Sequence, residues 1–314
     1  MITATEATPA LAFDVEVVRA VRLSPTFVRL TFGGPALASF HPCGPGGPRD
    51  LRVKVMVPSP GHPLPDLSDL SEGWYRRWLA LDAAVRGVMR TYTVRAARLG
   101  GPEPTIDVDF VLHLDEHGRG GPASAWAAAA GPGDRVTLIG PNAHSERYGG
   151  IEWRPPAPDP AAPVRVLLAG DETAVPAIAS VLESLPPGYA GHALLEVPDR
   201  ADFQDLATAS AVEVRWLARD AHPHGTRLEA SVGALLAACP PAARTEPVGW
   251  ADVDVDAELL WESAAEVGTG LYAWVAGEAG TVRALRRLLV HEHGVDRRSV
   301  SFMGYWRRGR AAPA

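Results

Sequence analysis

The first part of the chain, up to about residue 141, carries short apolar or alternating runs that glycine and proline interrupt. Alternation predicts β-strands, because side chains two positions apart share one face of a strand. One short helix is expected over the alanine-rich run that follows Gly121. Six strands with so little helix predict a closed antiparallel barrel. The predicted strands cover residues 14–21, 27–32, 51–57, 91–97, 105–112 and 135–139.

The second part of the chain has a different rhythm, in which apolar strands alternate with helices that carry one apolar face. This order predicts a parallel sheet with helices on both faces. Thr173 and Thr281 are expected to cap the helices that they begin. The predicted strands cover residues 164–169, 193–197, 212–217, 271–276 and 300–306, and helices are predicted over 173–185, over 226–239 and from 281 to the glycine at 294.

The length of 314 residues suits two domains. We expect a barrel domain over residues 10–150 and an α/β domain over 164–314. Between them, the proline-rich residues 151–163 predict a stiff linker. The insertions 58–78 and 240–270 follow neither pattern, and their role is left open.

Composition excludes several classes of protein. The formal net charge of −7 argues against general attraction to nucleic acids or anionic membranes. The two cysteines, Cys43 and Cys239, are too few for a zinc or iron–sulfur site, which takes about four protein ligands. The start lacks a signal-peptide pattern, and no run reaches the roughly 20 apolar residues of a membrane helix. We therefore expect a cytoplasmic monomer without nucleic-acid or membrane partners and without a resident metal.

The tetrapeptide Arg90-Thr91-Tyr92-Thr93 on a predicted strand has the chemistry to hold a dinucleotide. Arg90 and Tyr92 share one face of the strand, and Thr93 points the other way. A guanidinium binds phosphate oxygens in pairs, and a tyrosine ring packs on a flat heterocycle. Thr93 supplies a small hydroxyl near the reactive edge of such a ring. The tetrapeptide alone favours the alternative of an ordinary barrel strand with a surface ion pair and a core tyrosine.

The predicted helix after Gly121 offers a second contact to the same ligand. Its first backbone N–H groups, at Ala123 and Ser124, favour a pyrophosphate. The preceding strand, Asp109 to His113, adds a backbone edge at Val111 for the end of the ring system. His113 is a candidate contact for the pyrophosphate or the adenine. The alternatives are a helix that only closes the barrel and a histidine with a structural role.

The residues together resemble those of the siderophore-interacting proteins, which are FAD-dependent ferric-siderophore reductases within the ferredoxin-reductase-like superfamily. The tetrapeptide at 90–93 resembles the flavin motif of the superfamily. The likeness to the narrower family spans most of residues 14–309. Its further motifs are Asp109 to His113, Gly121 to Ser124 with Trp126, Ala169 to Ala174 with Pro176, Val275 to Glu278, and Gly304 to Gly309.

The resemblance implies a six-stranded antiparallel flavin-binding barrel followed by a parallel-sheet nicotinamide-binding domain. It implies that NADH or NADPH reduces the flavin, which then passes electrons to the iron of a ferric siderophore and so releases Fe(II). No residue is expected to act as a catalytic base. The residues implied to hold FAD are Arg90, Thr91, Tyr92, Thr93, Asp109, Val111, His113, Gly121, Ala123 and Ser124.

The resemblance also implies a basic pocket for the anionic iron chelate. Lys54, the one lysine of the chain, lies on a matching strand with Arg52 nearby. Both are substrate-binding candidates; the alternative is an ordinary edge-strand lysine.

In the second domain, the turn after the first strand is not a glycine-rich phosphate loop, and the charge of Asp171 would repel a phosphate there. This turn, with Thr173 and Ala174, is expected to face the flavin or its adenosine half. Glu196 ends the next strand, where an acid binds a ribose and favours NADH. Arg215 and Arg219 favour the 2′-phosphate of NADPH instead, so the choice stays open. The remaining cofactor candidates are Gly277 and Glu278, at the nicotinamide half, and Trp306, beside the flavin.

Two other functions stay open. One is a different flavin oxidoreductase of the superfamily, such as a free-flavin or ferredoxin reductase. The other is a protein that binds a ferric siderophore without turning it over.

Overall fold

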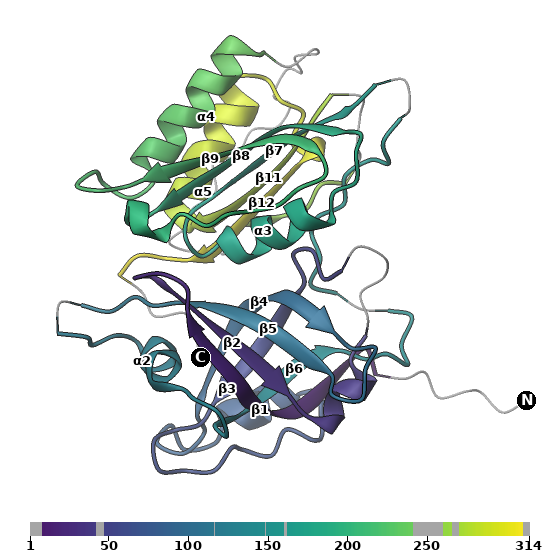
Figure 1. Ribbon diagram of the computed structural model, residues 1–314, viewed down its shortest axis with the longest axis vertical. Helices are drawn as coiled ribbons and strands as arrows, with labels where there is room; N and C mark the ends of the chain where they lie inside the picture. Colours follow the sequence, from purple (N-terminus) through teal and green to yellow (C-terminus); the bar gives the residue numbers. More distant parts are fainter. Residues whose placement is uncertain are drawn as a thin grey trace, which may run out of the picture. The chain divides into compact units, whose positions relative to one another are not determined.

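The computed structural model describes residues 8–41, 47–115, 117–147, 149–159, 162–240, 260–265 and 270–309. The chain folds into two compact units, and it passes from the first to the second between Ile151 and Glu152 (Figure 1). Each unit has its own sheet and its own apolar core.

The first unit is a closed six-stranded barrel with the strand order β1-β2-β5-β4-β3-β6, as the sequence predicts. Every neighbouring pair is antiparallel, and β1 closes the barrel by pairing with both β2 and β6. The strands are β1 (Ala10–Arg22), β2 (Phe27–Gly33), β3 (Arg52–Val57), β4 (Val88–Arg98), β5 (Thr105–Val111) and β6 (Arg135–Pro141).

Apolar side chains at alternate strand positions fill the barrel interior, among them Phe32, Val55 and Phe110. A 3-10 turn, η1 (Pro35–Ser39), and the helix α2 (Pro122–Ala129) accompany the strands. Trp126 and Ala127 of α2 pack against the same core.

The insertion between β3 and β4 has its own short helix, α1 (Trp74–Leu79), which the sequence pattern did not predict. Met56, Met89 and Ile139 form an apolar patch on the opposite side of the strands from the main core, and the insertion covers this patch with Leu67 and Trp78. The helix forms because its aromatic side chains bury apolar area against the barrel, a tertiary effect that local periodicity does not reveal.

The second unit is a six-stranded sheet with the order β10-β12-β11-β7-β8-β9. Five strands are parallel, as predicted, and the two-residue β10 adds an antiparallel edge beside β12. Most of the insertion 240–270 that contains β10 lies outside the described residues. The strands are β7 (Val164–Gly170), β8 (Tyr189–Val197), β9 (Ala211–Ala218), β10 (Trp261–Glu262), β11 (Leu271–Glu278) and β12 (Val300–Trp306).

Helices cover both faces of this sheet (Figure 1). The helix α3 (Val175–Ser184) lies on one face, and α4 (Thr226–Ala238) and α5 (Ala279–Arg286) lie on the other. The α5 helix continues as a π-helical segment, η3 (Arg287–Glu292), and two 3-10 turns, η2 (Arg200–Asp202) and η4 (Arg297–Ser299), complete the unit. No helix among the described residues is both long and apolar enough to span a bilayer.

The two predicted threonine caps are wrong, and carboxylates explain both cases. Thr173 precedes α3, where Asp171 Oδ1 accepts its backbone N–H over 2.9 Å. Thr281 lies inside α5, and Glu278 Oε2 accepts its N–H over 3.0 Å. The Thr173 hydroxyl donates to Asp171 Oδ1 instead of capping α3, and α5 is capped by Glu278, three residues before Thr281.

The order of the strands places one edge of the sheet at a topological switch point. From the central β7, the chain proceeds to β8 and β9 on one side and then crosses to β11 and β12 on the other. Ligands of open α/β sheets bind at the carboxyl ends of the strands where this reversal occurs. Asp171 and Glu278 follow or end the two strands that flank the reversal.

Candidate functional site

The β4 strand separates the predicted flavin residues onto two faces. Arg90 and Tyr92 lie opposite Val55 and Val53, whose side chains belong to the barrel core. Thr93 lies on the other face and is 5% exposed. The alternation derived from the sequence therefore holds along this strand.

Tyr92 is linked to α2 through aromatic contacts. The centre of its ring lies 4.3 Å from the centre of the Phe110 ring, and the Phe110 ring centre lies 6.0 Å from that of Trp126 in α2. Burial raises the pKa of Tyr92, and the nearby Arg90 opposes this only in part, so the phenol stays neutral. A neutral ring held between β4 and α2 suits packing against a flat heterocycle.

The guanidinium of Arg90 is half-buried and donates to the Met89 carbonyl oxygen over 2.8 Å. No carboxylate pairs with it within the described residues. The surface ion pair of the alternative interpretation is thus not found at Arg90. Its charge is available to an anion.

The start of α2 is also available to an anion. Gly121 is the N-cap and offers no side-chain acceptor, so the N–H groups of Ala123 and Ser124 are not capped by it. A Cβ on Gly121 would meet nothing within 4 Å, which marks an open side of the turn. The hydroxyl of Ser124 donates to the Val111 carbonyl oxygen over 3.3 Å and ties the helix to the end of β5.

Close approach of backbone brings the exposed His113 beside this helix start. Leu114 and Gly120 form an isolated bridge, and a Cβ on Gly120 would come within 2.5 Å of the His113 oxygen. Only glycine allows this approach. The positive N-terminus of α2 and the guanidinium of Arg90, which has no carboxylate partner among the described residues, fit a pyrophosphate. The neutral ring of Tyr92 fits the ring system of a flavin dinucleotide.

Asp109 does not fit the cofactor role predicted for it. Its carboxylate accepts two hydrogen bonds from Arg29, over 2.6 and 2.7 Å, and lies 3.8 Å from Arg95. The side chain is 1% exposed. A buried, bidentate ion pair gives Asp109 a structural role between β2, β4 and β5.

Arg52 and Lys54 lie on the same face of β3, opposite Thr93 and Thr91 respectively. Burial lowers the pKa of Lys54, and the charge of Arg52 lowers it further. No carboxylate pairs with Lys54 within the described residues, whereas its ammonium lies 5.9 Å from the centre of the Tyr75 ring. The two predicted substrate residues therefore form a positive face next to the flavin motif.

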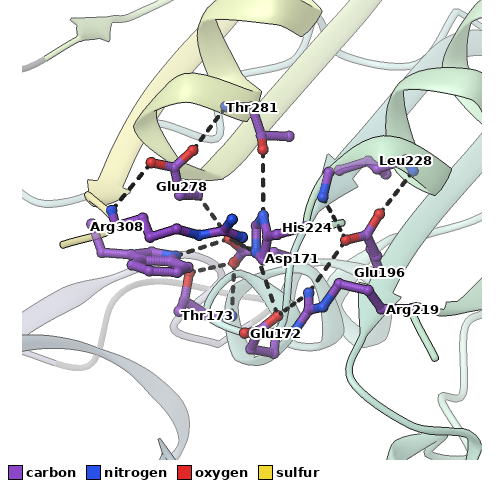
Figure 2. Close-up of polar contacts among 12 residues, drawn as sticks. Asp171, Glu172, Thr173, Glu196, Arg219, His224, Leu228, Glu278, Thr281 and Arg308 are labelled. Carbon is purple, nitrogen blue, oxygen red and sulfur yellow. Dashed lines mark hydrogen bonds and ion pairs between the residues drawn. The ribbon is translucent and has the colours of Figure 1, made fainter. Parts of the chain in front are cut away.

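In the second unit, Asp171 lies at the centre of a polar network at the switch point (Figure 2). Its Oδ2 accepts the backbone N–H of Glu278 over 2.7 Å and the indole N–H of Trp306 over 2.9 Å. Its Oδ1 accepts both the N–H and the hydroxyl of Thr173. Glu278 and Trp306, which are distant in sequence, and the neighbouring Thr173 thus meet at one buried carboxylate.

Gly277 makes this meeting possible. Its φ is +145°, and a Cβ there would come within 2.6 Å of Asp171 Oδ2. Glu278 then accepts N–H groups from Thr281 over 3.0 Å and from Arg308 over 3.3 Å (Figure 2). The carboxylate of Glu278 thus links the start of α5 to the residues after β12.

His224 belongs to the same network, although its place in the sequence gave no sign of it. Its Nε2 lies 3.3 Å from Asp171 Oδ2 and 3.8 Å from Glu172 Oε2. Burial alone would lower the pKa of His224, but the two acids outweigh it and raise the pKa. Burial alone would raise the pKa of Asp171, but His224, Thr173 and Trp306 outweigh it and lower the pKa. Both shifts favour the ion pair, in which His224 is protonated and Asp171 is ionised.

Glu196 is fully buried and does not face a ribose, which corrects the prediction. Its Oε1 accepts from Gly225 N over 2.8 Å, and its Oε2 accepts from Leu228 N over 2.9 Å, so it caps α4. Arg219 donates to Glu196 over 3.2 Å and to both oxygens of Glu172 (Figure 2). These contacts occupy the groups that the sequence offered for choosing between NADH and NADPH.

Two further candidates take other places. Ala174 is buried and is the N-cap of α3. Arg215 pairs with Glu213 along the exposed edge strand β9.

Asp171, Glu172 and His224 place one possible ligand atom each within 4.8 Å of one another, a spacing that suits a cation. Arg219 and the protonated His224 already supply positive charge to these acids. The cluster therefore fits an internal ion-pair network better than a metal centre.

Comparison with known proteins identifies two family models. One, described as a siderophore-interacting FAD-binding domain, matches residues 16–145. The other, described as siderophore-interacting protein, matches residues 163–309.

Individual relatives cover nearly the whole chain. An uncharacterised protein of Mycobacterium tuberculosis is 35% identical over 310 residues, which cover 96% of this chain and 92% of that protein. The ferric vibriobactin reductase ViuB of Vibrio cholerae is 28% identical over 296 residues, with coverage of 94% and 89%. A solved siderophore utilization protein from T. fusca superposes with a TM-score of 0.65 at 28% identity, covering 98% of this chain and 96% of that one.

Proposed function

Because the chain belongs to the siderophore-interacting protein family, we propose that it is a FAD-containing reductase that uses NADPH or NADH to reduce ferric siderophores and release Fe(II). Its relative ViuB is named a ferric vibriobactin reductase. Two observations in the barrel carry the proposal: Arg90 lacks a carboxylate partner among the described residues, and the start of α2 has no side-chain cap.

Arg90 and the N–H groups of Ala123 and Ser124 bind the pyrophosphate, since both are positive and no carboxylate of the described residues neutralises either. Tyr92 packs on the ring system, and Thr93 and Val111 contact its polar edge. Thr91, Gly121 and His113 lie next to these groups and complete the set. FAD held by these residues would supply the chemistry that links hydride transfer from the nicotinamide to single-electron reduction of iron.

Arg52 and Lys54 attract the anionic ferric chelate to the face of β3 that Thr93 shares. Their charge lowers the cost of bringing a negative complex next to the flavin motif. No residue takes up a proton in this scheme, because reduction of Fe(III) to Fe(II) weakens the chelate by itself. The iron leaves as Fe(II), and the protein needs no iron ligands of its own.

At the switch point, Gly277 and Glu278 hold the nicotinamide half, and Trp306 provides the flat side chain beside the reacting rings. Asp171 and Thr173 act through others: Asp171 fixes the Trp306 indole and the Glu278 backbone, and Thr173 fixes Asp171. Glu196 and Arg219 take no part in the choice of nicotinamide in this proposal, because Glu196 caps α4 and Arg219 bonds to Glu196 and Glu172.

The test is anaerobic. Purified protein, which we expect to be yellow, is mixed with NADPH or NADH, and bleaching of the flavin is followed for each. Ferric chelates are then added, and Fe(II) is trapped by a chromogenic ligand. A colourless protein would contradict the FAD assignment; faster turnover with ferredoxin or free flavin than with ferric chelates would favour a different reductase.

We also propose that the enzyme is a cytoplasmic monomer. Size-exclusion chromatography with light scattering tests its mass in solution, and cell fractionation tests its location. A dimer, or protein in the membrane fraction, would contradict it.

A further inference from the structure

The insertion between β3 and β4 places aromatic rings beside the proposed chelate site. Tyr75 of α1 has its ring centre 5.9 Å from the ammonium of Lys54. The ring centre of Trp74 lies 5.7 Å from that of Tyr75, with an angle of 80° between the ring planes. The ring centre of Trp78 lies 5.4 Å from that of Tyr75, with an angle of 37° between the planes. Trp74 and Tyr75 are only half-buried, so part of each ring faces solvent.

These rings have a fixed support. Trp78 is 2% exposed and belongs to the apolar cluster on the outer side of β3, β4 and β6. Its indole N–H donates to the Arg86 carbonyl oxygen over 2.9 Å, and the Arg86 guanidinium lies 5.4 Å from its ring centre. Arg86 in turn donates to the Leu79 carbonyl oxygen over 2.9 Å. The support holds Tyr75 in place before any ligand arrives, which reduces the entropy lost on binding.

Charge and aromatic surface therefore lie next to each other. Lys54 and Arg52 project from the same face of β3, and Lys54 has no carboxylate partner within the described residues. A separation near 6 Å is the outer limit of a cation–π contact, so Tyr75 holds Lys54 only weakly. A ligand that carries both negative charge and aromatic rings can use Lys54 and Tyr75 at once.

We propose that Tyr75, assisted by Trp74, is a specificity-determining residue that selects iron chelates whose donor groups are on aromatic rings, such as catecholates or phenolates. Lys54 meets the negative charge of the complex, and the Tyr75 ring packs on one of its aryl rings. This inference rests on the proposed function and adds to it the chemical class of substrate. It also gives the insertion a role that its sequence pattern did not reveal.

Gallium complexes test the inference without electron transfer, because Ga(III) resembles Fe(III) in charge and size but is not reduced by flavins. The flavin-loaded full-length protein is titrated by calorimetry with Ga(III) 2,3-dihydroxybenzoate, which is aromatic and anionic. Ga(III) citrate, anionic without rings, is the matched ligand. The variants are Tyr75→Leu, which removes the ring, Tyr75→Phe, which keeps it, and Trp74→Leu.

We expect Tyr75→Leu to weaken the aromatic complex about tenfold and the citrate complex less than about twofold. Tyr75→Phe should bind both as the wild type does, and Trp74→Leu should lose about threefold for the aromatic complex alone. Phe203→Leu removes a 38% exposed ring in the other unit and is the control for general effects of losing an aromatic side chain.

Equal losses for both gallium complexes, or no loss for the aromatic one, would overturn the role of Tyr75 and leave the proposed function standing. Wild-type protein that binds neither complex would remove the chelate site itself, and with it both proposals. If Tyr75→Leu does not fold, Trp74→Leu and the wild-type preference between the two complexes decide the question. A wild type that prefers citrate contradicts the inference.

Discussion

The barrel and the α/β unit both contain charged residues that the sequence marks as cofactor contacts, but the two units treat them differently. In the barrel, Arg90 and the start of α2 have no carboxylate or side-chain cap among the described residues. In the α/β unit, Glu196 and Asp171 accept several hydrogen bonds each from the protein itself. A charged side chain whose hydrogen bonds come from the protein has less capacity left for a ligand than one without such partners.

The largest effect on stability is expected in the α/β unit, where the protein itself binds the charged residues. Glu196→Ala leaves the N–H groups of Gly225 and Leu228 without their acceptor and removes one partner of Arg219. We expect the free energy of unfolding to fall by about 3 kcal/mol in urea titrations. Glu213→Ala, an exposed acid on β9, should change it by less than about 0.5 kcal/mol.

The same variant distinguishes capping from cofactor choice. Glu196→Ala that still folds should keep the wild-type ratio of NADH to NADPH activity. A shift in that ratio with no loss of stability would support the ribose contact of Glu196. It would contradict the difference between the two units described above.

Arg90→Ala tests whether the charge of Arg90 in the barrel is available to FAD. We expect affinity for FAD to fall about 30-fold, because a charge-assisted pair to phosphate contributes about 2 kcal/mol. The measurement is flavin retained after dialysis, followed by titration of the flavin-free protein with FAD. Arg19→Ala, an exposed arginine on β1 of the same barrel, should retain the wild-type flavin content. Full occupancy in Arg90→Ala would remove the pyrophosphate role.

The ion pair of Asp171 and His224 makes the free energy of unfolding depend on pH. The pKa of His224 is raised above 6.5, so its stabilisation is fully present below 6.5 and is lost as the pH rises through the folded value. The pKa of Asp171 is lowered below 3.8, so its contribution is present above 3.8 and is lost as the pH falls through the folded value.

The advantage of the wild type over His224→Gln should therefore be greatest between pH 3.8 and 6.5 and should amount to about 1–2 kcal/mol. Urea titrations at several pH values measure it. An advantage that grows at alkaline pH would show that His224 is neutral in the folded protein.

The smallest effect is expected for Trp306→Phe. It removes one hydrogen bond to Asp171 Oδ2, which keeps the N–H of Glu278 as a donor. We expect the free energy of unfolding to fall by about 0.5–1 kcal/mol. We expect the rate of flavin reduction to fall by more than this loss of stability would explain. Unchanged reduction kinetics would limit Trp306 to a structural role.

Both units follow from the sequence because their strands are encoded locally. Each barrel strand carries its own alternation and is followed by turn residues, and the parallel strands carry continuous apolar runs. The α1 helix and β10 escape prediction because their stability comes from contacts with distant strands. The caps at Thr173 and Thr281 fail for a related reason, since nearby carboxylates bind both threonines and the two helices are capped by other residues.

The site is predictable to the extent that its residues form local motifs. Residues 90–93 and 121–124 are local motifs that together indicate a flavin dinucleotide, although each alone also allows a structural role. His224 lies far from Asp171 in the sequence, on no recognisable pattern, and only the folding of the sheet brings the two together. The burial of Glu196 and the pairing of Asp109 are likewise properties of the fold, which spacing does not report.

The single carboxylate of Asp171 has a consequence for motion. It accepts amide hydrogens from Thr173, in the turn after β7, and from Glu278, the last residue of β11. Neither amide can open without disturbing the acceptor of the other, so their deuterium exchange should be slow and should slow further together when a ligand occupies this edge of the sheet.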